Sequence, residues 1–189
     1  MKMILVRHGQ SNYNLKDLCN GLPSKKVYLT PLGKKQASEV ALKLAKKKID
    51  VIYISKLFRS EQTAKIINRY HKVKMIADKR LNDRLMGEFE NKSAALFYAW
   101  RDKSKEPWAI APKGGESYID LEKRVKLFLN DLIAKDYKTV LVVSHLTVIA
   151  VIQGYFKRLS NRTIDRLNEK DIPNCKVVIV DLPKKAIKI

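Results

Sequence analysis

Arginine, histidine and carboxylate side chains follow the apolar segments of this sequence, at positions where strands would end. The set comprises Arg7, His8, Arg59, Asp83 and His145. Guanidinium groups bind anions, imidazoles act as nucleophiles or bases, and carboxyl groups transfer protons. If one fold brings these five side chains together, the sequence encodes a site for such chemistry.

The segments between these side chains predict the elements that must position them. Short β-branched runs alternate with longer amphipathic stretches, which indicates a layered α/β fold. Strands are predicted at residues 2–7, 50–55, 72–77, 138–145 and 175–182. Because ligands of open α/β sheets bind at the carboxyl ends of the strands, we expect the five side chains to meet at that edge.

Three helices are predicted between these strands. Thr30 is an N-cap before Pro31, and the apolar spacing predicts a helix from there through about Lys47. A second helix follows the strand at 50–55, and a third opens at Ser117. Their apolar positions are Ala64, Ile66 and Ile67 in the second helix and Leu121, Val125, Phe128 and Leu132 in the third.

The length of 189 residues predicts a single domain spanning residues 1–189. Its least regular part lies between Asp83 and Ser117 and contains several glycines and prolines. We therefore expect a lid-like insertion at about 84–116. Four aromatic residues of this segment offer contacts to a ligand or packing within the segment itself: Phe97, Tyr98, Trp100 and Trp108.

Composition and cysteine usage limit the class of protein. Hydrophobic residues make up 46% of the chain and charged residues 31%, which is typical of a globular protein. The apolar run at residues 3–6 is too short for a signal-peptide core or a membrane span, so we expect a cytoplasmic protein without a membrane partner. Cys19 and Cys175 form no CxxC or Cys/His cluster, so neither a disulfide framework nor a zinc site is predicted.

A net charge of +20 raises the question of an anionic partner: nucleic acid, a membrane surface or a phosphorylated substrate. Much of the excess is lysine on predicted helix surfaces, as at residues 46–48, where a helix end favours cations. The sequence has no aromatic RNA-binding segment, zinc-finger spacing or basic-region heptads. We expect no specific nucleic-acid partner.

An ordered series of motifs resembles the histidine phosphatase superfamily, the phosphoglycerate mutase-like proteins, over nearly the whole chain. The family pattern RHGxSxxN is matched by Arg7, His8, Gly9, Ser11 and Asn14. Further matches are Leu29, Thr30, Gly33, Gln36 and Ala37; Ser55 through Arg59 to Ala64; Gly114 to Ser117, then Arg124 and Val125; the segment ending at His145; and Ile172 to Asn174. The resemblance implies a three-layer α/β/α sandwich with a mostly parallel central sheet.

The resemblance also implies a role for each side chain of the site. His8 is the nucleophile that attacks phosphorus and forms a phosphohistidine. The phosphoryl oxygens are held by Arg7, Asn14, Arg59 and His145. Asp83 occupies the place of the acid that protonates the leaving oxygen and later activates water, so activity is expected to be best at mildly acidic pH. The resemblance implies a small phosphorylated substrate, and neither a cofactor nor a metal ion is expected.

Three positions depart from the family pattern. Asp83 stands where most members of this branch carry glutamate, which is one methylene longer, although aspartate is the proton donor in the acid-phosphatase branch. Leu146 follows His145 where glycine is common, and Asn91 replaces the glycine of an EG pattern. We therefore expect the width or the backbone of the pocket to differ from that of the family.

The fate of the phosphoryl group separates the functions that remain. Transfer to water makes a phosphatase, whereas transfer back to a sugar acid makes a phosphoglycerate mutase. Mutases of this type carry a longer insertion after the acid, and only 33 residues separate Asp83 from Ser117 here, which favours a phosphatase. A catalytically weakened protein that binds phosphorylated ligands is the other alternative. The sequence leaves the oligomeric state open between monomer and homodimer.

Overall fold

The computed structural model describes residues 1–183, apart from the side chains of residues 165 and 166, and the strands of this range form one sheet. The strands are β1 (Lys2–Arg7), β2 (Val51–Ile54), β3 (Met75–Ala77), β4 (Thr139–Ser144) and β5 (Val177–Asp181). Their order is β3-β2-β4-β1-β5, with β5 antiparallel to β1 and the other pairs parallel. Each predicted strand is present within its predicted range.

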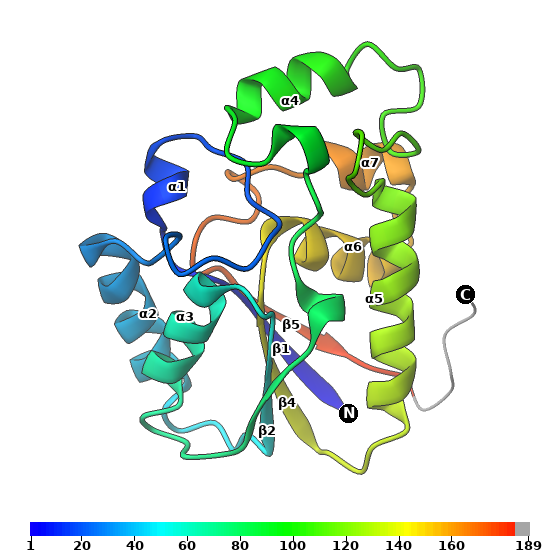
Figure 1. The fold of residues 1–189 in the computed structure, drawn as a ribbon. Helices are drawn as coiled ribbons and strands as arrows, with labels where there is room; N and C mark the ends of the chain where they lie inside the picture. Colours follow the sequence, from blue (N-terminus) through cyan, green and yellow to red (C-terminus); the bar gives the residue numbers. More distant parts are fainter. Residues whose placement is uncertain (184–189) are drawn as a thin grey trace.

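Helices cover both faces of this sheet, which confirms the predicted α/β/α sandwich with a mostly parallel sheet. Figure 1 shows α2 and α3 on one side of the strands and α5 and α6 on the other. The helices are α1 (Asn12–Leu15), α2 (Pro31–Leu44), α3 (Phe58–Ile67), α4 (Ala94–Arg101), α5 (Tyr118–Ile133), α6 (Leu146–Lys157) and α7 (Asn161–Arg166), with 3₁₀ turns η1 (Lys79–Leu81) and η2 (Gly87–Phe89).

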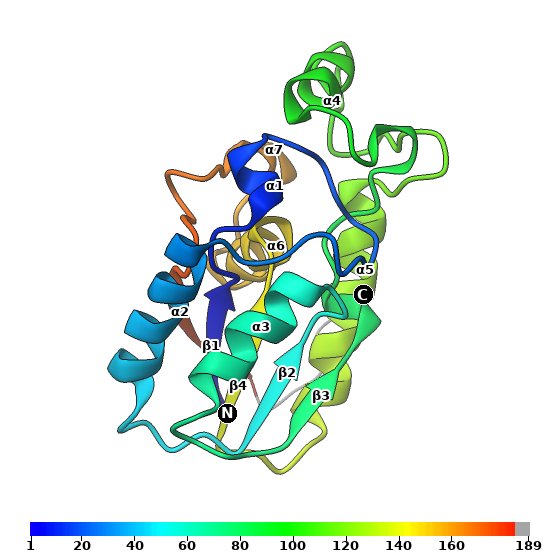
Figure 2. The ribbon, with the colours of Figure 1, turned by 60° about the vertical axis from the view of Figure 1, so that its left-hand side comes forward.

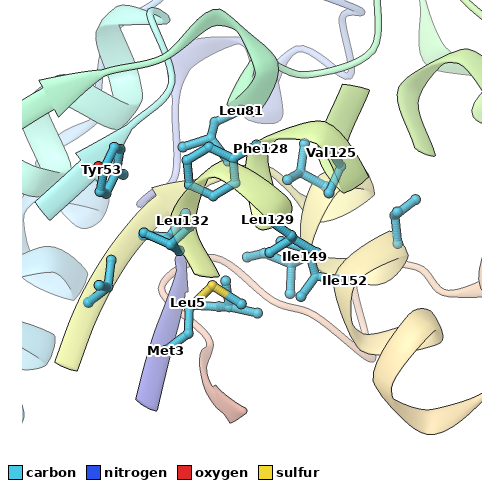
Figure 3. Close-up of a cluster of buried hydrophobic side chains, with 14 of the residues drawn as sticks. Met3, Leu5, Tyr53, Leu81, Val125, Phe128, Leu129, Leu132, Ile149 and Ile152 are labelled. Carbon is cyan, nitrogen blue, oxygen red and sulfur yellow. The ribbon is translucent and has the colours of Figure 1, made fainter. Parts of the chain in front are cut away.

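The strand β1, which lies between β4 and β5, contributes alternate side chains to two cores. Met3 and Leu5 pack with α5 and α6, together with the side chains labelled in Figure 3. Ile4 and Val6 point to the opposite face and pack with α2 and α3. Because both faces of a parallel strand are buried, the strand is a continuous apolar run, and this places Arg7 at its carboxyl end.

Helix capping follows the predicted signals. The Thr30 hydroxyl accepts a hydrogen bond from the Gly33 amide at 3.0 Å, with Pro31 in the first turn of α2. The predicted end at Lys47 is about one turn too late, because the regular helix ends at Leu44. Ser117 caps α5 reciprocally with Asp120.

The segment 84–116 contains a helix that was not predicted. In α4 only Phe97 is fully buried, and it packs against other aromatic residues of the same segment. This helix has only eight residues, which is shorter than the stretch of sequence over which a helical period is recognised. Figure 2 shows α4 standing clear of the two helix layers, above the end of the sheet toward which β1 points.

Two further helices, α6 and α7, follow β4 and were also not predicted. Val148, Ile149, Ala150, Val151 and Ile152 in α6 are all buried. A helix that is apolar on all sides shows no amphipathic period, so its sequence does not distinguish it from a buried strand. No helix of the described residues is long and apolar enough to cross a membrane.

Candidate active site

The five predicted side chains meet at the carboxyl edge of the sheet. Because β1 and β4 are paired in register, His8 and His145, each the first residue after its strand, lie side by side with ring centroids 5.1 Å apart. Arg7 ends β1, and Arg59 enters from the first turn of α3. Asp83 comes from the loop between the two 3₁₀ turns.

His8 is held as a neutral imidazole with a defined tautomer. Its Nδ1 lies 2.7 Å from the carbonyl oxygen of Gly9, which can only accept, so Nδ1 carries the hydrogen. Its Nε2 accepts a hydrogen bond from Arg59 Nε at 3.1 Å. Burial, followed by the charges of Arg59 and other neighbours, holds the pKa of His8 well below its usual value. The Nε2 lone pair therefore faces the cationic site.

Glycine at position 9 follows from the close packing of this turn. A Cβ atom on Gly9 would lie 2.4 Å from the carbonyl oxygen of Gly33 at the start of α2. The Gly9 amide also donates to the Thr63 hydroxyl at 3.1 Å. These contacts fix the turn that carries His8.

Arg59 contacts most of the other polar groups of the site. Its Nη1 and Nη2 donate to the side-chain and backbone oxygens of Asn20 at 2.6 and 2.9 Å. Nη2 also lies 3.3 Å from Nδ1 of His145 and 3.4 Å from Oδ2 of Asp83. Burial lowers the pKa of Arg59 to about 10, so the guanidinium stays charged at neutral pH.

Arg7 supplies the second guanidinium. Its Nη1 donates to the Ile172 carbonyl oxygen at 2.7 Å, and its Nη2 contacts Oε1 of Glu169 at 2.5 Å. Its Nε is buried and has no hydrogen-bond partner among the residues that the structure describes. A buried donor of this kind is suited to an oxygen of a bound anion.

His145 is fully buried, and its position depends on two serine hydroxyls. Its Nε2 lies 2.8 Å from the Ser55 hydroxyl and 3.4 Å from that of Ser60. Burial, then the charges of Arg59 and Arg7, lower the pKa of His145 well below its usual value. The lowered pKa favours the neutral form of this histidine.

Asp83 reaches the site despite its short side chain. Its Oδ2 lies 3.4 Å from Arg59 Nη2 and 3.6 Å from His145 Nδ1, and the side chain is 26% exposed. Its Oδ1 accepts hydrogen bonds from the Thr147 hydroxyl and from the Arg84 amide. The aspartate side chain is therefore long enough to approach both Arg59 and His145.

Arg124 sets the backbone position of Asp83. It donates to the carbonyl oxygens of Asn82 and Asp83 at 2.9 and 3.1 Å. Glu116 holds the Arg124 guanidinium through both carboxylate oxygens, at 2.6 and 2.8 Å. This pair explains the motif at Gly114 to Ser117 and the arginine that follows it.

Asn14 lies in the same cavity, on α1. Its Oδ1 accepts from the Ser11 amide at 2.9 Å and lies 3.5 Å from Nδ2 of Asn174. The amide group of Asn14 thus keeps its Nδ2 as a donor for a ligand. Asn174 also donates to the His8 carbonyl oxygen at 3.0 Å, which ties the start of the last strand to the site.

Arg7, His8, Asn14, Arg59 and Asp83 line one cavity of about 620 Å³, whose lining also includes residues of the segment 84–116. His145 is fully buried beside Arg59 and does not line this cavity. Phe97 and Tyr98 line this cavity, as does Leu146. Trp100 instead packs against other aromatic side chains of the segment. The cavity thus has a cationic floor and an aromatic upper wall.

Asn91 shows why a departure from the family pattern is tolerated. Its φ of +62° is left-handed, a conformation that asparagine adopts more readily than most residues. Its side-chain oxygen also accepts a hydrogen bond from the Tyr13 hydroxyl at 2.8 Å. The replacement therefore adds a contact between α1 and the segment 84–116.

Several residues of the site carried no assigned role in the sequence. Ser60 and Thr147 lie within two positions of Arg59 and His145, and Asn20 precedes a glycine. Hydroxyl and amide side chains at such positions are common, so only their contacts identify them. Glu169 lies beside no motif, and its contact with Arg7 spans 162 positions of the chain.

Possible metal ligands and thiols of the described residues are arranged as follows. Among residues 1–183 no group of three or more His, Cys, Asp or Glu side chains is arranged to hold a metal ion. Cys19 lines the cavity, but burial raises the pKa of its thiol to about 12, so it stays protonated.

Known proteins resemble this chain in sequence and in fold. A model of the histidine phosphatase superfamily (branch 1) matches residues 3–189. A putative phosphoserine phosphatase 2 of Hydrogenobacter thermophilus is 35% identical over 152 residues, which cover 76% of this chain and 72% of the relative. A 2,3-bisphosphoglycerate-dependent phosphoglycerate mutase of Cytophaga hutchinsonii is 30% identical over 176 residues, covering 86% and 80%.

A solved structure confirms the fold. The mycobacterial glucosyl-3-phosphoglycerate phosphatase in complex with VO3 superposes with a TM-score of 0.80 at 24% identity, covering 95% of this chain and 90% of that chain. The family model covers nearly all of this sequence, and Arg7, His8, Asn14 and Arg59 line one cavity. The chain therefore belongs to branch 1 of the histidine phosphatase superfamily.

Proposed function

We propose that this protein hydrolyses the phosphomonoester of a small metabolite through a phosphohistidine on His8, without a metal ion. The observation that carries this proposal is the state of His8. Its Nδ1 is tied to a backbone carbonyl and its Nε2 faces the guanidinium of Arg59. A neutral imidazole beside two fixed cations is suited to attack a dianionic phosphoryl group.

Binding of the phosphoryl group uses the cations of the cavity floor. Its oxygens accept hydrogen bonds from Arg7, Asn14 and Arg59, because charge-assisted bonds to planar guanidinium groups are strong and directional. The bound anion favours the charged form of His145, which then donates to a further oxygen. These donors neutralise the charge that otherwise repels the nucleophile.

The first chemical step transfers the phosphoryl group to the protein. Nε2 of His8 forms the bond to phosphorus as the bond to the leaving oxygen breaks. Asp83, protonated when substrate is bound, gives its proton to that oxygen, and the alcohol departs. The resulting Asp83 carboxylate then takes a proton from water, which attacks phosphorus and releases orthophosphate and His8.

Residues 84–116 form the lid of this site in our proposal. Three backbone hydrogen bonds of 2.8 to 2.9 Å join this segment to the loop after α1. The bonded pairs are Asn91 with Cys19, Lys92 with Cys19, and Ala94 with Asp17. These bonds hold α4 over the cavity. We also propose that the protein acts in the cytoplasm on small phosphorylated metabolites, not on nucleic acid.

Phosphoglycerate mutase activity is the second candidate. The alignments of this chain with two proteins named as phosphoglycerate mutases extend over 80% or more of the length of those proteins. A mutase must keep its phosphohistidine from water and return the phosphoryl group to a sugar acid. The exposed fraction of Asp83 favours hydrolysis, since water reaches this carboxylate.

A panel of phosphomonoesters tests the proposal. Purified protein, with and without a chelator, is incubated with p-nitrophenyl phosphate, sugar phosphates, O-phosphoserine and 3-phosphoglycerate. We expect orthophosphate release that the chelator does not change and that vanadate inhibits. Isomerisation of 3-phosphoglycerate would indicate phosphoglycerate mutase activity. No reaction with any of these esters would indicate a protein that binds phosphorylated ligands without turning them over. A strict requirement for magnesium or zinc would contradict the mechanism.

The phosphorylated residue is identified in the same material. The protein is incubated briefly with a substrate labelled in its phosphate, and the reaction is then quenched. We expect an acid-labile, base-stable label on His8. His8→Ala removes both the label and turnover, because His145, the other imidazole beside Arg59, is fully buried and does not line the cavity. Label on any other residue would overturn the assignment.

A further inference from the structure

Arg84 is a buried arginine that the proposed reaction does not use. Its guanidinium carbon lies 4.4 Å from the ring centroid of Phe97 and 4.2 Å from that of Tyr118. The residue is only 3% exposed. Aromatic rings stack on the faces of a guanidinium, so its hydrogen-bond donors are left to point outward in its plane.

No carboxylate of the described residues pairs with Arg84. Its Nε is buried without any hydrogen-bond partner in the same part of the chain. Other arginines differ: Arg80 is paired with Asp78, and Arg124 with Glu116. Because a buried charge without a partner is costly, a fold that keeps one is prepared for an anion from outside.

The position of Arg84 shows where that anion must lie. Arg84 lines the same 620 Å³ cavity as His8 and directly follows Asp83, the residue on the leaving-group side. The phosphoryl group occupies the cationic floor between Arg7 and Arg59. The hydrogen-bond donors of the Arg84 guanidinium are therefore available to the part of the substrate that leaves with the oxygen.

We propose that Arg84 binds a carboxylate group carried by the alcohol part of the substrate. This inference rests on the proposed function and specifies its substrate class, a phosphomonoester with a carboxylate in the leaving group. A planar carboxylate matches the planar donor edge of one guanidinium. A second phosphate fits less well, because Asp17 and Asp83 line the same cavity and repel a dianion.

Two substrates that differ in one carboxylate test this inference. O-phosphoserine and O-phosphoethanolamine share the phosphate, the ammonium group and the ester chain, and only the first carries a carboxylate. The comparison is made with the wild type, with Arg84→Met, which keeps a side chain of similar length between the two rings, and with Arg84→Lys. The control is Lys170→Met, which removes a cation from the rim of the same cavity.

The wild type is expected to prefer O-phosphoserine. Arg84→Met lowers kcat/KM for O-phosphoserine by about 10- to 100-fold, the usual effect of losing a hydrogen bond to a charged group. It leaves O-phosphoethanolamine within about threefold, which also shows that the variant is folded. Arg84→Lys restores part of the loss because it keeps the charge without the planar fork. Lys170→Met changes both substrates equally.

Other outcomes overturn the inference without touching the proposed function. Equal losses on both substrates in Arg84→Met would show that Arg84 only packs the lid. A loss confined to a bisphosphate ester such as fructose 1,6-bisphosphate would assign the site to a second phosphate. A wild type that hydrolyses both esters equally well would show that the carboxylate is not bound.

Binding separates this inference from a failure of the proposed function. If the wild type hydrolyses neither ester, calorimetry with His8→Ala still compares their affinities. Tighter binding of O-phosphoserine that disappears in His8→Ala/Arg84→Met supports the carboxylate site. Equal affinity of the two esters for His8→Ala overturns it.

Discussion

Replacing Asp83 by asparagine separates its chemistry from its structural contacts. Asparagine has the same size and keeps an oxygen that accepts from the Thr147 hydroxyl and the Arg84 amide. The contact with Arg59 is 3.4 Å long, and Arg59 keeps its shorter hydrogen bonds to His8 and Asn20 when this contact is lost. We therefore expect Asp83→Asn to fold normally.

The catalytic effect of this replacement is expected to be much larger. A positioned acid contributes about 10²- to 10⁴-fold to a rate, which corresponds to about 3 to 5 kcal/mol of transition-state stabilisation. Asp83→Asn should therefore lower kcat/KM for an alkyl phosphate by about 10²-fold or more. The loss is smaller on p-nitrophenyl phosphate, because p-nitrophenolate leaves with little help from a proton.

The assay measures kcat/KM for phosphate esters of alcohols and phenols of increasing acidity. The wild-type rate should depend weakly on the leaving group, whereas the rate of Asp83→Asn should fall steeply as the alcohol becomes less acidic. Asp83→Glu keeps the acid and preserves or raises the rate. Asp17→Asn is the matched control, because Asp17 is another carboxylate of the cavity with no contact to His145.

An unchanged rate of alkyl phosphate hydrolysis in Asp83→Asn would refute this reasoning. The structure leaves few substitutes for the acid. Glu116 is held by Arg124, and Glu90 accepts from the amides of Gly21 and Met86. Glu169, which lines the cavity, would then be the acid to test next.

Two further predictions concern charge at the site. The Glu169 side chain is 67% exposed and contacts Arg7, so its carboxylate competes with a phosphate for this guanidinium. Glu169→Gln should therefore tighten inhibition by orthophosphate by about 2- to 5-fold. Weaker inhibition of this variant would show instead that Glu169 orients Arg7. The lowered pKa values of His8 and His145 mean that the unfolded chain binds protons below about pH 6.5 that the folded protein does not. The free energy of unfolding, measured with urea, should therefore fall on acidification from about pH 7 to 5, by up to about 1.4 kcal/mol per unit for each histidine, and His145→Asn should reduce that slope. An unchanged slope in this variant would contradict the assignment of a neutral buried His145.

Local sequence was sufficient for most of the framework. The strands β1, β2 and β4 were predicted because their apolar runs are buried on both faces. The caps at Thr30 and Ser117 were predicted because each bonds to a residue only three positions further along the chain. The five side chains of the site were predicted to converge because each lies at a strand end or just beyond, and parallel strands bring such ends to one edge.

Packing between distant segments decided the rest. The sequence did not settle whether Asp83 reaches the site, because its position depends on Arg124, 41 positions further along the chain. It also did not reveal α4, whose buried Phe97 packs within the segment 84–116, or the stacking of Arg84 on Phe97 and Tyr118. Hydrogen bonds and stacking between residues far apart in the sequence produce no periodic pattern of residue types. Many residue types are compatible with the local backbone conformation at each of these positions, so the sequence around them does not reveal the contact. The chain therefore determined its reactive groups through short-range signals, and only the tertiary structure determined their distances, their charge states and the unpaired arginine beside them.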